Sequence, residues 1–166
     1  MLSHFPALLH RLGLKGAHAL RLAWWSLRRP QLHGCNVIAA DSRGRVLLVR
    51  HSYQSPDKWM LPGGGMARGE PAEDAACREL LEETGCVLAD ARCFAVEVVG
   101  LAGASNHVHL VAGTTADEPR PDQREIIAAQ FFAPDDLPET ATRTAQARIE
   151  RWVAQDNGPS PMTITI

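Results

Sequence analysis

Three glutamates close together in the sequence mark the stretch of this chain that is best suited to chemistry. Glu82 and Glu83 lie three and four residues after Glu79, so on a helix all three carboxylates project from one side. Pro71 suits the beginning of such a helix, and Gly85 suits a left-handed helix stop. Carboxylates at this spacing repel one another, whereas Mg²⁺, with Mn²⁺ as the alternative ion, prefers carboxylate and carbonyl oxygens as ligands. The pattern therefore indicates either a divalent-cation site or a solvated acidic helix face.

Three glycines immediately before the expected helix favour the cation site over the plain acidic face. Gly63, Gly64 and Gly65 allow backbone conformations and close approaches that a Cβ atom would block. A glycine turn at a helix entry beside carboxylates is typical of a site for a metal ion and a phosphate group. A separate stripe of the helix is expected to pack elsewhere in the domain, formed by Cys77, Leu80, Leu81 and Thr84.

The same stretch resembles the signature of a known family. Gly64 is followed by five residues and Glu70, then by seven residues and the run Arg78-Glu79-Leu80-x-Glu82-Glu83-x-Gly85. This long pattern with fixed spacing is similar to the Nudix box of the Nudix hydrolases. Cys86 stands where the box usually carries a bulky aliphatic residue, and as a small hydrophobe it affects packing more than chemistry. The resemblance covers about residues 34–153.

The resemblance implies a role for each carboxylate. Glu79, Glu82 and Glu83 would bind Mg²⁺, and the carbonyl group of Gly63 would supply a backbone ligand. Either Glu79 or Glu125 would act as the catalytic base, and the sequence does not choose between them. Glu125 has a plain surface residue as its alternative interpretation.

Two further residues of the box have a functional and a structural interpretation. By resemblance, Arg78 would orient the neighbouring carboxylates, and Glu70 would lie at the helix entry or support the ligands from behind. A purely structural ion pair is the alternative for both residues. Nudix-fold proteins that only bind nucleotides, or regulate, commonly lack box glutamates, whereas this sequence keeps all of them.

The resemblance also implies a reaction and a substrate class. Nudix enzymes hydrolyse the diphosphate linkage of a nucleoside diphosphate joined to another moiety X, by attack of a metal-activated water on phosphorus. A small-molecule nucleotide derivative is therefore the expected partner, with Arg50, Tyr53, Gly64 and Gly65 as the expected substrate-binding residues. The identity of X does not follow from the sequence.

Length and composition describe one ordinary soluble domain. The 166 residues are 45% hydrophobic and carry 17 basic and 19 acidic side chains, which argues against a general nucleic-acid binder. No apolar stretch reaches the length of a membrane span. The cysteines lack CxxC spacing and are expected to be free thiols in a reducing compartment, so we expect a cytoplasmic protein.

Residues 1–32 differ from the rest of the chain, because they are basic and contain no acidic side chain. Leu20, Ala23, Trp24 and Leu27 follow the spacing of an amphipathic helix. Such a helix would pack on its own domain or on a second subunit as a homodimer. A helix lying on an anionic membrane surface is the alternative, which would make this an interaction protein.

The remaining chain predicts an α/β (α+β) domain over residues 33–155, followed by a tail over residues 156–166. The resemblance specifies a Nudix-type α/β/α sandwich with a mixed sheet. His107 and His109 alternate along one strand face, as a second polar contact or as solvent-facing residues. Strands are expected at residues 35–40, 45–50, 59–61, 92–101 and 108–114, with a turn at 103–106 and a closing helix at about 139–154.

Overall fold

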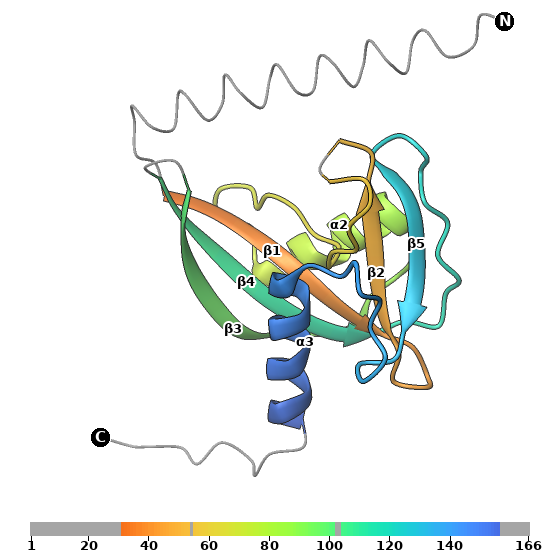
Figure 1. Cartoon of the computed structure of the whole chain (residues 1–166). Coiled ribbons are helices and arrows are strands. Elements are labelled where there is room, and N and C mark those ends of the chain that lie inside the picture. The colour runs from red at the N-terminus through yellow and green to blue at the C-terminus, as the bar shows by residue number, and fades with distance from the viewer. Residues whose placement is uncertain (1–30, 54, 102–103, 157–166) are drawn as a thin grey trace, which may run out of the picture.

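The computed structural model describes residues 31–53, 55–101 and 104–156 (Figure 1). The predictions for the basic N-terminal arm and for the tail beyond residue 156 lie outside the described residues. The elements follow in the order β1 (Gln31–Ala40), β2 (Val46–His51), α2 (Ala72–Thr84), β3 (Ala89–Leu101), β4 (Ala104–Thr114), β5 (Ile126–Phe132) and α3 (Arg143–Asp156).

The five strands form one mixed sheet in the order β3-β4-β1-β2-β5. β1 runs parallel to β4, and the β1–β2, β2–β5 and β3–β4 pairs are antiparallel. Helix α2 packs on one face of the sheet and α3 on the other, which confirms the predicted sandwich (Figure 1). Among the described helices, none is long and apolar enough to cross a membrane.

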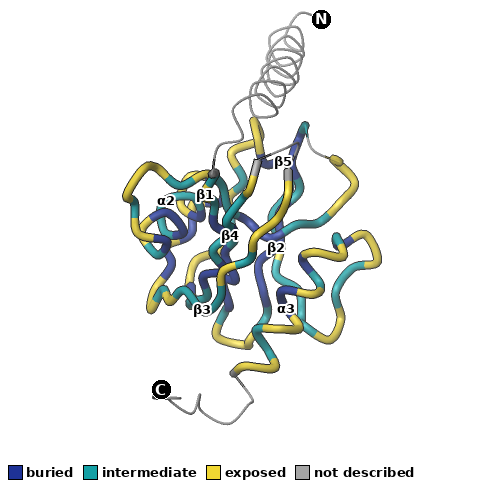
Figure 2. Tube along the Cα trace, turned by 90° about the vertical axis from the view of Figure 1, so that its left-hand side faces the viewer, coloured by how far each residue is buried: buried dark blue, intermediate teal, exposed yellow. Residues whose placement is uncertain are grey.

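Side chains of the central strands alternate between two cores, because successive residues of a strand point to opposite faces. Figure 2 shows the buried segments along the central strands and the exposed ones in the loops and along the end of β3. All of Val46 to Val49 is buried, as the apolar run predicts. The core under α2 includes Cys35, Val37, Ala39, Leu47, Ala75, Ala76 and Leu80. The core under α3 includes Ile38, Val46, Leu48, Leu61, Ala145 and Ile149.

Several predicted boundaries were wrong. β1 begins at Gln31, four residues before the predicted strand at residues 35–40, and β4 begins at Ala104 inside the predicted turn. In the predicted strand at residues 59–61, Trp59 and Met60 form only isolated bridges, to Ala141 and Val49, and no strand of the sheet is present there. The last helix begins at Arg143 and not near residue 139, because the Thr142 side chain accepts the Ala145 N–H at 3.2 Å and caps the helix there.

A buried arginine joins α3 to the sheet. Arg148 is 8% exposed, and its Nε and Nη2 atoms donate to Glu97 Oε2 on β3 at 2.9 and 2.8 Å. Its Nη1 atom donates to the Asn36 side chain on β1. One guanidinium therefore connects three elements.

Replacing Arg148 with alanine is expected to lower the free energy of unfolding by roughly 2 kcal/mol, because partly buried polar groups lose their partner. Arg151 is the matched control, since it reaches the same Glu97 at 3.4 Å but is exposed. Arg151→Ala should change stability by no more than about 0.5 kcal/mol. Urea unfolding of both variants measures the difference, and equal effects would contradict this account.

Candidate active site

Helix α2 positions the three glutamates of the box. Pro71, which was predicted as the first helical residue, is the N-cap, and the helix begins one residue later at Ala72. Gly85 ends the helix at φ 72°, with its N–H donating to the Leu81 carbonyl. Leu80 and Thr84 are buried as predicted. Leu81 was predicted to pack, but it is 52% exposed, because α2 turns that position away from the sheet.

The glycine loop before α2 lies against the start of β1. The N–H of Cys35 donates to the Gly64 carbonyl at 2.9 Å, and the N–H of Met66 donates to the His33 carbonyl at 3.0 Å. Gly63 adopts φ 141°, and a Cβ there would lie 2.2 Å from the Cys35 carbonyl oxygen. A Cβ on Gly64 would lie 2.4 Å from a carboxylate oxygen of Glu79. Only glycine allows the loop to approach both β1 and α2 this closely.

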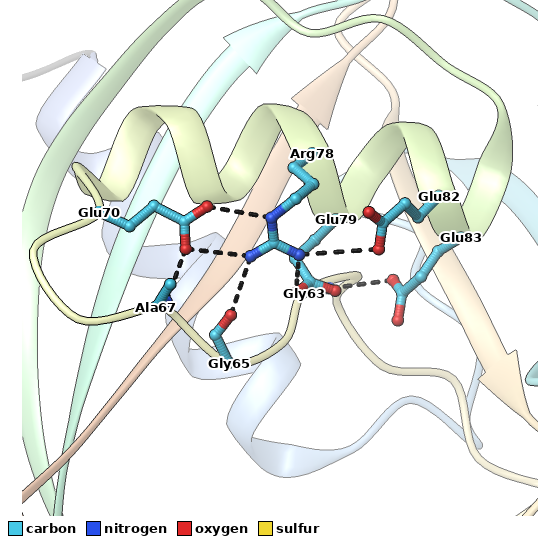
Figure 3. A network of polar contacts seen from close by, with 8 residues as sticks. All are labelled: Gly63, Gly65, Ala67, Glu70, Arg78, Glu79, Glu82 and Glu83. Atoms are coloured by element: carbon cyan, nitrogen blue, oxygen red, sulfur yellow. Dashed lines mark hydrogen bonds and ion pairs between the residues drawn. The ribbon is translucent and has the colours of Figure 1, made fainter.

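Glu83 is a carboxylic acid held at the base of this loop. It is 9% exposed, and its Oε2 atom accepts the Gly63 N–H at 3.0 Å (Figure 3). Burial raises the pKa of Glu83 to about 8, and the nearby carboxylates of Glu79 and Glu125 contribute to the rise. Without a cation, this site therefore disfavours the charged form of Glu83.

Arg78 is the positive charge closest to the other two glutamates. Its Nη1 atom donates to Glu79 Oε1 at 2.6 Å and lies 3.6 Å from Glu82 Oε2 (Figure 3). Burial raises the pKa of Glu79, although the Arg78 guanidinium opposes this rise. Glu82 is exposed. Arg78 therefore lies among the carboxylates of the box.

Glu70 completes a network that fastens the loop to the helix. Its carboxylate accepts hydrogen bonds from Arg78 Nε and Nη2 at 3.0 and 3.1 Å (Figure 3). The same carboxylate accepts the Ala67 N–H at 2.7 Å. Arg78 Nη2 also donates to the Gly65 carbonyl at 3.0 Å. These hydrogen bonds lower the pKa of Glu70, with the Arg78 contact as the largest cause. The structural ion pair is present, and it holds the glycine loop beside the glutamates.

Glu125 lies directly before β5 and is exposed. The backbone holds it in place, since its carbonyl accepts the Ser52 N–H at 2.8 Å and its N–H donates to Asp122 Oδ1 at 3.1 Å. Its charge, like that of Asp122, raises the pKa of Glu83, so both carboxylates lie in the neighbourhood of that residue. Sequence reasoning missed Asp122, whose only signal is its place in the polar loop before β5.

The structure places Arg50 apart from the acidic cluster. Its Nε atom donates to the Pro56 carbonyl at 2.8 Å, and its guanidinium lies 5.6 Å from the Trp59 ring centre, beside the core under α3. Tyr53 contacts the His51 ring edge-on at 5.8 Å. Of the four expected substrate-binding residues, the structure brings Gly64 and Gly65 to the glutamates.

The chemistry of these donor groups suits a divalent cation. The donor set consists of hard carboxylate oxygens, and the glycine at position 64 leaves room at the Glu79 carboxylate that a Cβ would fill. Glu83 is buried among like charges, which a cation would stabilise. In this arrangement the Arg78 guanidinium is the countercharge of Glu79 and Glu82. Among the described residues, no three His, Cys, Asp or Glu side chains surround one point closely enough to hold an ion.

The raised pKa of Glu83 predicts how the stability of the metal-free protein depends on pH. The folded state binds this proton up to about pH 8, whereas an ordinary glutamate loses it near 4.5. The contribution of Glu83 to stability is therefore full at low pH and is lost as pH rises through this window. Glu83→Gln removes the titration, so the stability of the variant relative to the natural protein should increase as pH rises. Denaturation in chelator at several pH values tests this, and a constant difference would contradict it.

The chain matches the NUDIX domain family over residues 31–153. It is 29% identical to the NAD-capped RNA hydrolase NudC of Vibrio cholerae over 78% of this chain and 48% of that protein. It is also 29% identical to the RNA pyrophosphohydrolase of Sphingopyxis alaskensis, over 70% of this chain and 73% of that protein. The chain thus spans about half the length of the NAD-capped RNA hydrolases that it matches.

Solved structures agree with the family match. The MutT NUDIX hydrolase of Burkholderia pseudomallei superposes with a TM-score of 0.63 at 31% identity, covering 73% of this chain and 97% of that one. The match to the family, the five-stranded sandwich and the box helix with its glycine loop all lead to one conclusion. The chain belongs to the NUDIX domain family.

Proposed function

We propose that this protein is a hydrolase that cleaves the diphosphate linkage of a nucleoside diphosphate joined to another moiety X. The observation that carries the proposal is the buried Glu83, held by the Gly63 N–H among the carboxylates of Glu79, Glu125 and Asp122. Such a cluster is costly for a fold unless a cation uses it. Family membership supports the same reaction class.

The ion that we propose is Mg²⁺, with Mn²⁺ as the alternative. Glu79, Glu82 and Glu83 would hold it together with the carbonyl of Gly63. A bound ion of this kind neutralises the phosphate oxygens and lowers the pKa of water. Binding would require the cation to replace Arg78 as the countercharge of Glu79, since the Nη1 atom lies 2.6 Å from that carboxylate.

The other residues of the site either hold the glycine loop in place or accept a proton. Through its contacts to Glu70 and Gly65, Arg78 keeps the glycine loop next to the carboxylates, so that a phosphate group can meet the loop's backbone. Glu79 and Glu125 are the two candidates for the base that takes the proton of the attacking water. Glu79 has a pKa raised by burial, which favours a base, and Glu125 is exposed to incoming water.

The names of the relatives widen the choice of X. One relative is named an NAD-capped RNA hydrolase and another an RNA pyrophosphohydrolase, so diphosphate linkages at RNA ends join the small nucleotide derivatives as candidate substrates. All of these candidates share one chemical feature, because each would present a diphosphate linkage to the same acidic cluster.

A substrate panel tests the proposal. Nucleoside triphosphates, dinucleoside polyphosphates, nucleotide sugars, dinucleotides and NAD-capped RNA would each be incubated with the protein in Mg²⁺ and in chelator. The expected result is release of a nucleoside monophosphate, or of an RNA 5′-monophosphate, only in Mg²⁺. Metal-independent release, or no release from any substrate by the folded protein, would contradict the proposal.

A further inference from the structure

The sheet face on which α2 packs continues beyond that helix. At the end where β1 begins, Val96 is paired with His109, Val98 with His107, and His107 with His33. Paired residues share a face, and His33 and His109 each lie two residues from a core residue under α2 (Cys35 and Val111), so they point to that same face. We call these five residues the valine–histidine face; they lie on the neighbouring strands β3, β4 and β1, which Figure 1 shows side by side.

The valine–histidine face is open and weakly polar. Val96 and Val98 are 50% and 64% exposed. The His33 Nδ1 and His109 Nε2 atoms lie 3.4 Å apart, and the His33 and His107 rings stack with centres 5.0 Å apart. Burial and the two neighbouring histidines lower the pKa of His109, which favours the neutral form of this ring. The exposed valines and the imidazole rings beside them form a surface suited to a partner.

Acidic side chains border this face. The first turn of α2 carries Glu73 and Asp74. Glu73 accepts the N–H of Cys93 on β3 at 3.0 Å, and its pKa is lowered by that contact and by the nearby His109. A basic, apolar segment would therefore complement both the valines and this edge.

We propose that the segment containing residues 20–27 of this same chain covers the valine–histidine face. The chain enters the sheet at Gln31, which is paired with Ser105 at this end of β4. Leu27 is only four residues before Gln31, so it lies within about 14 Å of it even in an extended chain. The segment is thus tethered beside the surface that it would cover.

The composition of the segment fits this surface. Leu20, Trp24 and Leu27 recur at helical spacing and form one apolar stripe. The arm up to residue 30 carries five basic side chains, among them Arg21 and Arg28, and no acidic one. Apolar contact with the valines and attraction to the acidic first turn of α2 both favour binding of the segment to this face. This proposal does not depend on the hydrolase activity.

A double-mutant cycle in the full chain tests the contact. Val98→Ser and Leu27→Ser are made singly and together, and the urea midpoint is measured for each. Val87→Ser is the matched control, because Val87 is 61% exposed but lies outside the face, between α2 and β3. The Val98→Ser shift should shrink or vanish in the Leu27→Ser background, whereas the Val87→Ser shift should be the same in both backgrounds.

Additive effects of Leu27→Ser and Val98→Ser would overturn the proposal. Sedimentation velocity at two protein concentrations distinguishes the same chain from a second copy. Coupling together with a concentration-dependent dimer that Val98→Ser disrupts would also overturn it, in favour of a homodimer interface. As a second measurement, NMR of the full chain should show NOEs from the Trp24 ring to the Val98 methyl groups, and their absence would count against the contact.

Discussion

Replacing Glu83 with glutamine is expected to lower kcat/KM for metal-dependent hydrolysis by at least about 100-fold, the scale on which loss of a metal-bound group is felt. The amide keeps the size of the side chain and one acceptor for the Gly63 N–H, so the fold should persist. What is lost is the negative charge that a cation would bind. Initial rates with the best substrate of the panel, at several Mg²⁺ concentrations, measure the effect.

Glu73→Gln is the matched control for this variant. Glu73 lies on the same helix, but its carboxylate accepts the Cys93 N–H and takes no part in the acidic cluster around Glu83. Its activity should remain within about twofold of that of the natural protein. If the Glu83→Gln protein is folded and turns over at the natural rate, Glu83 does not hold a catalytic ion.

Replacing Gly63 with alanine is expected to lower the free energy of unfolding by about 2–4 kcal/mol and to impair activity as well. The added Cβ would lie 2.2 Å from the Cys35 carbonyl oxygen and 2.9 Å from the Asn36 Cα, at a φ of 141°. Because both contacts are with backbone, no side chain can rotate away to relieve them. The loop would move and take the hydrogen bond to Glu83 with it.

Gly65→Ala separates this effect from a general cost of changing the loop. A Cβ on Gly65 meets no atom within 4 Å, and its φ is not in the left-handed region. Stability of this variant should change by less than about 0.5 kcal/mol. Thermal or urea unfolding compares the two alanine variants, and similar losses in both would contradict the steric explanation.

The parts of the fold that were predictable from the sequence are those set by local patterns. Gly85 ends α2 as predicted, because a left-handed residue requires little from the rest of the protein. The apolar run of Val46 to Val49 is buried for the same reason that it reads as a strand. The resemblance to the Nudix box supplied what periodicity could not, namely the sandwich and the order of its layers.

The parts that were not predictable depend on contacts between distant segments. Leu81 is apolar and helical, yet whether it packs depends on how α2 is rotated on the sheet. Asp122 approaches Glu83 only because β5 pairs with β2, a contact between residues far apart in the chain. The polar link from Arg148 to Asn36 and Glu97 likewise spans three elements, and no local pattern indicates it.

Titrating the full chain with Mg²⁺ in a calorimeter tests the central claim most directly. The natural protein should bind the ion near neutral pH with release of a proton, because the pKa of Glu83 is about 8 and the cation takes the place of that proton. Glu83→Gln should weaken binding by at least about tenfold and abolish the proton release. If the folded natural protein binds neither Mg²⁺ nor Mn²⁺, the acidic cluster of α2 is not a metal site and the proposed mechanism is wrong.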